Sequence, residues 1–419
     1  MKPTSISLKK NIIWSFSGNV IYNASQWLIV VLISKFLDVY AVGQYGLALA
    51  ITSPVVMFTN MQLRTVVATD NNNDYLVSEY LKSRILTSLL AIVLILLITL
   101  SLQKSNDLLI VVLLIAIYKF FESISDLIFG FFQKLERMDI ISKSLGIKSC
   151  LVLLSIGCAL YFFNNLLFGL SLTIASLVLV LIFFDLKNFL SFRDEKLSVT
   201  YLKSSHLTIN KWFIKRFISL IKLALPLGIT SVIFSINTYL PRYYLQLYFD
   251  ESAVGYYTAI SYLNLIGIML ITAIGQSALS RLSKLFSSSK DEFIKLLLKM
   301  LCISFIIGLF GIFISFVWGS KILTIFYKKE YSIYNFELLI LSFAGIFWYM
   351  AWSLNFGINA IRRYREQVPI FITVLLTQFI AQYLLTPRLG ILGSAIAMTI
   401  SSFILFIFFI LLTIKILKQ

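Results

Sequence analysis

The sequence predicts an all-α integral membrane protein that crosses the bilayer about twelve times. Three observations predict this class. Hydrophobic residues make up 59% of the 419 residues and charged residues only 13%, about half of the charged share in soluble domains. The apolar residues form runs of about 20, the length that spans a bilayer as a helix. The 36 Lys and Arg residues stand almost entirely in the segments between those runs.

The predicted spans follow one another with short polar breaks. The first apolar run is too long for the core of a cleaved signal peptide, so we predict it as a span. Asn164-Asn165 divides the fifth span from the sixth, and Pro387-Arg388 divides the last two. The predicted spans are 11–36, 43–66, 85–102, 108–132, 146–163, 166–184, 219–247, 254–279, 297–318, 337–360, 367–386 and 391–414.

The placement of basic residues predicts the orientation of the chain. An even number of spans puts both termini on one side, and 28 Lys and Arg residues fall on that side against six on the other. Loops on the cytoplasmic side are enriched in Lys and Arg, so both termini are predicted to be cytoplasmic. We therefore interpret the net charge of +17 as a determinant of membrane orientation that also contacts anionic lipid headgroups, and not as a sign of nucleic-acid binding.

The chain is predicted to consist of two six-helix bundles. Residues 1–184 form the first and 219–419 the second, and the hydrophilic stretch 185–218 is a cytoplasmic linker. The segment AVGQY at 41–45 recurs as AVGYY at 253–257, six spans later. An even spacing keeps the direction through the membrane, so the repeat is parallel. Parallel repeats are typical of transporters, with the substrate path between the halves.

Motifs for nucleotide, metal or hydrolytic chemistry are not found in the sequence. It contains neither a Walker-type phosphate loop nor a G-x-S-x-G elbow. His206 is the sole histidine, and the three cysteines lie in apolar runs without metal-ligand spacing, where we expect them to be buried. We therefore predict no catalytic residues, no metal and no cofactor. H⁺ and Na⁺ are both candidates for a coupling ion.

The fourth span carries the most informative polar residues. Lys119, Glu122 and Asp126 are spaced by three and four, which places them on one helix face. Ionisable side chains inside a membrane are costly and usually mark a substrate or ion path. We predict that Lys119 lines a substrate cavity and that Glu122 and Asp126 are ion-coupling candidates. The structural alternative is a Lys119–Glu122 pair that only joins two helices.

Other spans add weaker polar stripes. In the seventh span Arg242 follows a stripe of small polar residues, and its guanidinium could bind phosphate or extend to headgroups. The stripe in the first span could bind sugar hydroxyls or join helices. The predicted cavity residues are Lys119, Arg242, Asn19, Asn23, Gln26, Thr238 and Gln276.

Several motifs in order resemble one known family. They are NxxW at 11–14 followed by Gly18, VGQYGLA at 42–48, KLALPLG at 222–228, GYY at 255–257 and GILGSA at 390–395. With these motifs the whole chain resembles the O-antigen and polysaccharide flippases, the Wzx-like branch of the multidrug/oligosaccharidyl-lipid/polysaccharide exporter superfamily.

The resemblance implies a V-shaped pair of bundles around a central cavity. It implies transfer of undecaprenyl-pyrophosphate-linked oligosaccharides, for O-antigen (lipopolysaccharide), capsule or a similar polymer. Transfer would run from the cytoplasmic to the periplasmic leaflet of the bacterial inner membrane, by alternating access. Implied partners are membrane lipids and the polysaccharide polymerase and chain-length machinery. Family cavities are cationic, which Lys119 and Arg242 match and Glu122 and Asp126 do not.

Three alternatives stay open. A drug or small-molecule antiporter of the same superfamily would use Glu122 and Asp126 and would not need Arg242. A polysaccharide polymerase would be expected to carry a large outer loop, whereas the outer loops here are short. A flippase for the peptidoglycan lipid precursor would usually have fourteen spans.

Overall fold

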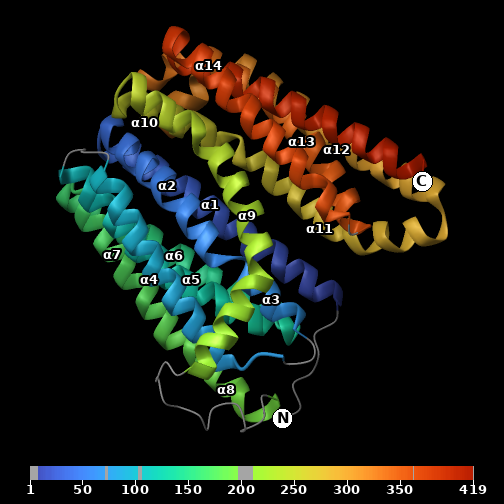
Figure 1. Cartoon of the computed structure of the whole chain (residues 1–419). Coiled ribbons are helices and arrows are strands. Elements are labelled where there is room, and N and C mark those ends of the chain that lie inside the picture. The colour runs from blue at the N-terminus through green and yellow to red at the C-terminus, as the bar shows by residue number, and fades with distance from the viewer. Residues whose placement is uncertain (1–7, 71–73, 102–105, 197–210, 362, 419) are drawn as a thin grey trace. The chain divides into compact units, whose positions relative to one another are not determined.

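The computed structural model describes residues 8–70, 74–101, 106–196, 211–361 and 363–418, and every regular element in these ranges is helical (Figure 1). The elements of the first half are α1 (Leu8–Phe36), α2 (Val39–Asn60), α3 (Leu63–Thr69), α4 (Val77–Ser101), α5 (Asn106–Lys134), α6 (Met138–Phe163), α7 (Leu166–Val180), the π-helix η1 (Leu181–Leu186) and α8 (Lys187–Lys196). Those of the second half are α9 (Lys211–Tyr248), α10 (Glu251–Leu263), α11 (Leu265–Ser288), α12 (Lys290–Phe326), the 3-10 helices η3 (Lys329–Tyr334) and η4 (Tyr364–Glu366), α13 (Asn335–Ala360) and α14 (Gln367–Lys418).

The number of spans agrees with the prediction. Eleven helical stretches of the described residues are long and apolar enough to cross a membrane, and the last of them is α14, with 52 residues. At about 1.5 Å per residue, α14 would be more than twice as long as the hydrocarbon core is thick. Its path is broken at Gly390, where φ is 59° and ψ is −131°. This backbone conformation is readily adopted only by glycine, so α14 contains two spans, divided just after Pro387.

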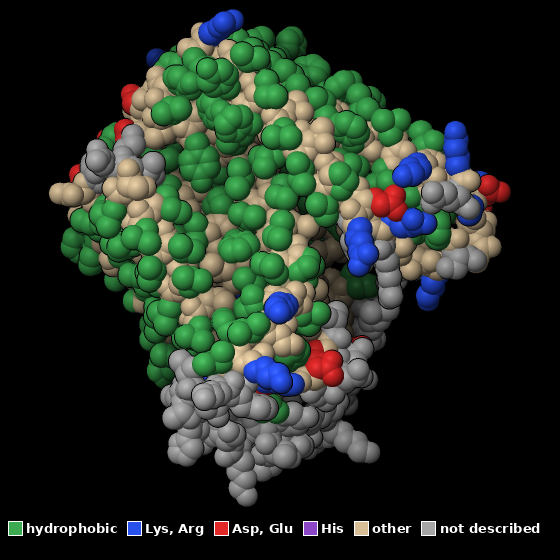
Figure 2. Space-filling view, in the orientation of Figure 1, with side chains coloured by type: hydrophobic (Ala, Val, Ile, Leu, Met, Phe, Trp, Pro, Cys, Tyr) green, Lys and Arg blue, Asp and Glu red, His purple; other side chains and the backbone are tan. Residues whose placement is uncertain are grey.

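The outer surface is apolar along the helices. On the face in Figure 2, hydrophobic side chains cover most of the surface, and charged side chains gather toward the ends of the helices. Large apolar side chains such as Phe316 (72% exposed) and Phe183 (69%) stand outward, as expected where lipid is the solvent. The prediction that Cys150, Cys158 and Cys302 are buried is wrong, since all three are exposed. An apolar run in a membrane helix has outward positions as well as inward ones.

The described chain separates into two compact units. The N-terminal unit contains residues up to Ile29 and from Ile51 to Ser235; the C-terminal unit contains Val30–Ala50 and Ile236 onward. Three helices, α1, α2 and α9, thus contribute residues to both units. The predicted boundaries at 184 and 219 remain a prediction. Residues 197–210 of the predicted linker lie outside the described residues, and the described segments on either side of them are helical.

Within the N-terminal unit, the core forms around α5. Leu127, Ile128 and Phe132 of α5 are almost completely buried and pack with Leu63 of α3 and Leu220 of α9. Because lipid is as apolar as these side chains, close packing and polar contacts hold such helices together. The end of α5 that is predicted to face the cytoplasm is therefore where α3, α5 and α9 pack together.

Within the C-terminal unit, the two copies of the repeated motif contact each other. A Cβ atom added to Gly43 of α2 would lie 1.7 Å from the backbone oxygen of Glu251, at the start of α10. A Cβ added to Gly255 of α10 would lie 2.2 Å from the backbone oxygen of Val39. Each contacted residue stands four positions before the other glycine, so the two copies meet symmetrically. Small residues allow this close approach of backbones.

Candidate functional site

The first part of the candidate site is a contact between α1 and α5. Lys119 Nζ lies 2.7 Å from Glu122 Oε2 on the same face of α5. The Tyr22 hydroxyl of α1 donates a hydrogen bond to the other oxygen of Glu122. Both charged side chains are only partly covered, at 21% and 25% exposure. The Lys119–Glu122 pair is therefore present, and it is both tied to a neighbouring helix and accessible.

The residues of the predicted polar stripe of α1 make different contacts in the structure. Gln26 and Tyr22 hydrogen-bond to the side chain of Tyr118, the residue before Lys119. Asn23 is half-buried, whereas Asn19 is exposed and its amide donates to the Ser15 carbonyl of its own helix at 2.7 Å. Of the predicted residues in α1, Gln26 is thus the one that reaches the polar residues of α5.

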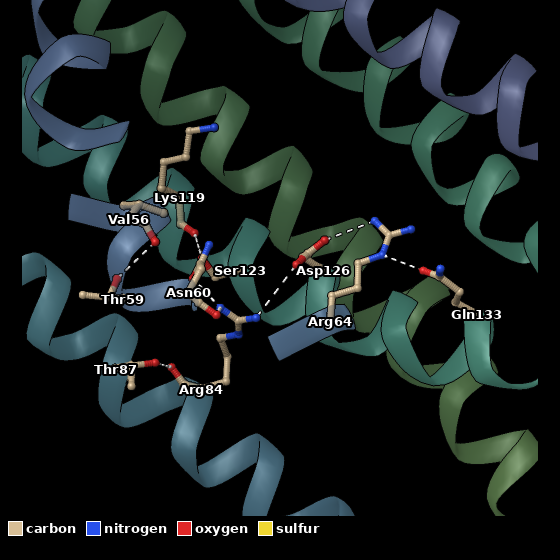
Figure 3. A network of polar contacts seen from close by, with 10 residues as sticks. All are labelled: Val56, Thr59, Asn60, Arg64, Arg84, Thr87, Lys119, Ser123, Asp126 and Gln133. Atoms are coloured by element: carbon tan, nitrogen blue, oxygen red, sulfur yellow. Dashed lines mark hydrogen bonds and ion pairs between the residues drawn. The ribbon is translucent and has the colours of Figure 1, made fainter. Parts of the chain in front are cut away.

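The second part of the site surrounds Asp126, one turn further along α5. Its Oδ1 accepts a hydrogen bond from Arg64 Nη1 of α3 at 3.2 Å, and its Oδ2 lies 3.9 Å from Arg84 Nη2 of α4. Arg64 also donates from Nε to Gln133 at 3.2 Å. Arg84 donates from Nη1 to both oxygens of Asn60. Figure 3 shows one carboxylate between two guanidinium groups from two different helices.

The third part joins α6 to the π-helix η1. Lys148 Nζ lies 2.6 Å from Asp185 Oδ2, and Ser144 donates to Oδ1 of the same carboxylate at 2.5 Å. The side chains of Lys148 and Asp185 are 4% and 0% exposed. Lys148 also lies over the ring of Phe129 at 4.6 Å, with the guanidinium of Arg64 at 5.7 Å from the same ring. π-Helical turns inside α-helices often accompany functional sites.

These three parts form one ionic cluster of the N-terminal unit, because Lys148 interacts electrostatically with Glu122, Asp126 and Asp185. The cluster carries four cations against three carboxylates, so its formal charge is +1. Burying charges in a membrane helix is costly unless they are paired, and such groups usually serve transport. The members of the ionic cluster are Arg64, Arg84, Lys119, Lys148, Glu122, Asp126 and Asp185.

Arg242 occupies a separate site in the C-terminal unit. It is 5% exposed, and its Nε donates to the Thr258 hydroxyl of α10 at 3.0 Å. Its guanidinium lies 4.7 Å from the ring centre of Tyr239 and 5.9 Å from that of Tyr262. A side chain held in this way does not extend to lipid headgroups.

The two remaining predicted cavity residues also belong to the C-terminal unit. Thr238 is half-buried on α9, and Gln276 is exposed on α11. The structure thus brings Lys119, Glu122 and Gln26 together with their neighbours in one unit, whereas Arg242, Thr238 and Gln276 lie in the other.

Uncharged side chains form a closed ring between α13 and α14. Asn355 donates to Gln367 at 2.9 Å, Gln367 donates to Asn359 at 2.8 Å, and Asn359 donates to Asn355 at 2.7 Å. Each amide gives one hydrogen bond and accepts one. The ring therefore satisfies itself and joins the two helices.

A second uncharged cluster lies within α14, across the break at Gly390. The Gln382 side-chain oxygen accepts hydrogen bonds from Thr386 at 2.5 Å and from Ser394 at 3.1 Å. All three side chains are fully buried. These contacts link the two spans that α14 contains.

Sequence reasoning missed four members of the ionic cluster. It counted Arg64, Arg84 and Lys148 with the basic residues of the cytoplasmic loops and placed Asp185 in the linker, because each lies at the edge of an apolar run. For Arg84 and Lys148 this assignment is wrong: they are 0% and 4% exposed inside α4 and α6. The helices continue past the apolar windows, and the charged residues are paired with one another. The spacing of four between Ser144 and Lys148 was a signal that could have indicated a shared partner.

Comparison with known proteins finds relatives in polysaccharide biosynthesis. A family model described as polysaccharide biosynthesis protein matches residues 8–286, about two thirds of the chain. The capsular polysaccharide biosynthesis protein CapF of Staphylococcus aureus is 29% identical over 396 residues, which cover 94% of this chain and 96% of that protein.

Solved structures of transporters share the fold. The lipid II flippase MurJ in an inward closed conformation has a TM-score of 0.74 at 15% identity, with 96% of this chain and 87% of MurJ covered. An inward-facing multidrug resistance MATE family transporter of the MOP superfamily has a TM-score of 0.70 at 12% identity, with 95% of each chain covered. A MOP superfamily transporter from Pyrococcus furiosus has a TM-score of 0.62 at 15% identity, covering 99% and 98%. At these identities the likeness concerns the fold alone.

Proposed function

The chain belongs to the polysaccharide biosynthesis protein family, and we propose that it is a flippase for lipid-linked oligosaccharides. The proposed cargo is an undecaprenyl-pyrophosphate-linked repeat unit, carried from the cytoplasmic to the outer leaflet of the bacterial plasma membrane by alternating access. The name of the S. aureus relative favours a capsule over O-antigen as the polymer. The polymerase and chain-length machinery that act next on the repeat unit are the proposed partners.

The ionic cluster is the observation that carries this proposal. A multi-pass protein that only anchored other proteins would not need seven charged side chains inside one helical unit, since each costs free energy to bury. Lys119, Glu122 and Tyr22 offer donors and acceptors suited to sugar hydroxyls, and both charged residues are partly exposed. The formal charge of +1 suits a cargo whose sugar is attached through pyrophosphate.

We propose that Lys119 and Gln26 contact the cargo from the N-terminal unit and that Arg242 and Thr238 do so from the C-terminal unit. Glu122 and Asp126 are proposed to take up a coupling ion, either H⁺ or Na⁺. Both termini are proposed to be cytoplasmic. C-terminal reporter fusions test this orientation. A reporter that is active only in the cytoplasm should be active at the C-terminus, and a reporter that is active only in the periplasm should be inactive there.

A deletion strain tests the function. We expect surface polysaccharide to disappear and complete single repeat units to accumulate on the lipid carrier in the cytoplasmic leaflet. Repeat units that reach the outer leaflet without being polymerised would instead identify a polymerase. A plasmid copy of the gene should restore export and serves as the control.

A second candidate function is an ion-coupled antiporter for drugs or other small molecules. It is favoured by the two carboxylates, Glu122 and Asp126, on one face of a spanning helix. The same deletion strain separates the two functions: unchanged surface polysaccharide with increased sensitivity to cationic drugs would support the antiporter.

A further inference from the structure

The guanidinium of Arg84 is fully buried but only partly satisfied by the protein. Its Nη1 donates to Asn60, whereas Nε and Nη2 have no hydrogen-bond partner among the described residues. Nη2 lies 3.9 Å from Asp126 Oδ2, a distance too long for a hydrogen bond. Buried donors are normally satisfied, and open ones on a cation are unfavourable.

The two open donors form one edge of the guanidinium. Two other arginines of the N-terminal unit use this edge to hold a carboxylate: Arg137 donates from Nε and Nη2 to Asp139 at 2.8 and 2.9 Å, and Arg216 donates from the same atoms to Glu79 at 3.0 and 3.1 Å. A two-pronged edge of this kind matches carboxylate and phosphate oxygens. In Arg84 the edge is present and unfilled.

Asp126 is the nearest anion to this edge, and it is shared. Its Oδ1 accepts from Arg64 at 3.2 Å, whereas its Oδ2 lies 3.9 Å from Arg84 (Figure 3). The side chains of Arg64 and Asp126 are 32% and 36% exposed, whereas Arg84 is enclosed. A ligand can therefore reach Arg64 and the position of Asp126 first.

We propose that Asp126 stands in for a phosphoryl group, and that the phosphate ester of a ligand displaces it to bind between Arg64 and Arg84. A phosphoryl group has more acceptor oxygens than a carboxylate, so it can hydrogen-bond to Arg64 and also fill the open edge of Arg84. Asp126 also interacts electrostatically with Lys148, so the two arginines are not its sole cationic neighbours among the described residues. On the proposed function, on which this inference rests, the ligand is the pyrophosphate of the lipid-linked cargo.

Binding of inorganic pyrophosphate to the purified full-length protein in neutral detergent tests the proposal. We expect Asp126→Asn to bind pyrophosphate about tenfold more tightly than the wild type, because the competing charge is gone, and Arg64→Gln to bind about tenfold more weakly. Asp139→Asn removes a carboxylate from the Arg137 pair of the same unit and is the matched control. Unchanged or weaker binding by Asp126→Asn, or the same gain in Asp139→Asn, overturns the proposal.

A second arm distinguishes the two sources of a phosphate ester. Phosphatidylglycerol in mixed micelles is titrated against bound pyrophosphate. If it displaces pyrophosphate from the wild type at equal concentration, the site belongs to bilayer headgroups and the cargo assignment is overturned. Selectivity for pyrophosphate supports the cargo assignment. This experiment measures binding alone and is independent of the deletion strain. If pyrophosphate does not bind as expected, the deletion phenotype can still support the flippase function. If the deletion strain exports polysaccharide normally, the flippase function is contradicted but the binding result stands.

Discussion

The two units of the molecule use polar residues in opposite ways. In the N-terminal unit the buried polar contacts include ion pairs, such as that of Lys148 with Asp185. In the C-terminal unit they are made mainly by amides and hydroxyls, as in the ring of Asn355, Gln367 and Asn359. Neutral amides that satisfy one another join helices without responding to an ion or an anion. Charged groups with shared partners can exchange them for a ligand.

This contrast assigns different tasks to the two units. The ionic cluster of the N-terminal unit has partly exposed members and open donors, which the proposed contact with cargo requires. In the C-terminal unit the closed amide ring joins α13 to α14, and the Gln382 cluster links the two spans of α14 across the break at Gly390. Arg242 is the exception in that unit, because it is a buried cation held by a hydroxyl and two aromatic rings.

The largest expected effect concerns the stability of the N-terminal unit. Asp185→Asn leaves Lys148 buried without its direct counter-charge, which should lower the free energy of unfolding by about 3–5 kcal/mol. Thermal unfolding in detergent measures the change. Glu292→Gln on the exposed Glu292–Lys295 pair of α12 is the control, and we expect no change in its midpoint. Equal midpoints for the two variants would mean that the buried pair is not what holds η1 to α6.

The next effect concerns transport. Lys119→Ala and Arg242→Ala should each reduce export of surface polysaccharide by about tenfold or more, comparable to the loss of one charge-assisted contact, while protein levels hold. Export is measured in the deletion strain complemented with each variant. Lys295→Ala, in an exposed pair, is the control. Normal surface polysaccharide in both variants would contradict the assignment of Lys119 and Arg242 to the cavity.

A smaller effect is expected where the repeated motifs meet. Gly43→Ala or Gly255→Ala places a methyl group against backbone, which should destabilise the C-terminal unit by about 1–3 kcal/mol. Gly146 and Gly311 are helical glycines with no atom within 4 Å of an added Cβ. Alanine at either control position should be neutral or stabilise by up to about 1 kcal/mol. Thermal unfolding in detergent compares the four variants. The same loss of stability at all four positions would contradict the claim that close contact between the two copies of the motif stabilises the C-terminal unit.

The smallest effect sharpens the comparison between the units. Asn359→Ala opens the amide ring and should cost about 0.5–1 kcal/mol, as is typical of a hydrogen bond between membrane helices. Export should remain at the wild-type level. A loss of export as large as that of Lys119→Ala, at equal protein level, would place the ring in the transport path and end the contrast between the units.

The sequence predicted the fold because apolar runs of bilayer length are a strong signal. Twelve spans followed from the lengths of the apolar runs, and the division of the last two followed from the Pro387-Arg388 break. The repeated motif predicted a parallel repeat, and the structure adds that its two copies contact each other. The Lys119–Glu122 pair followed from helical spacing. The partners of Asp126 did not, because Arg64 and Arg84 come from other helices and were counted with the loop residues. One sequence records which residues share a helix face, but not which helices meet at that face.

The most direct test of the account is transport by the purified protein in liposomes. A lipid-linked pyrophosphate oligosaccharide is placed in both leaflets, and the fraction that becomes accessible to an added glycosidase is followed over time. We predict that the wild-type protein makes the inner pool accessible and that Lys119→Ala does so at least tenfold more slowly. An inner pool that stays protected with wild-type protein, or equal rates for both proteins, would contradict the claim that the ionic cluster serves the transfer of a lipid-linked sugar.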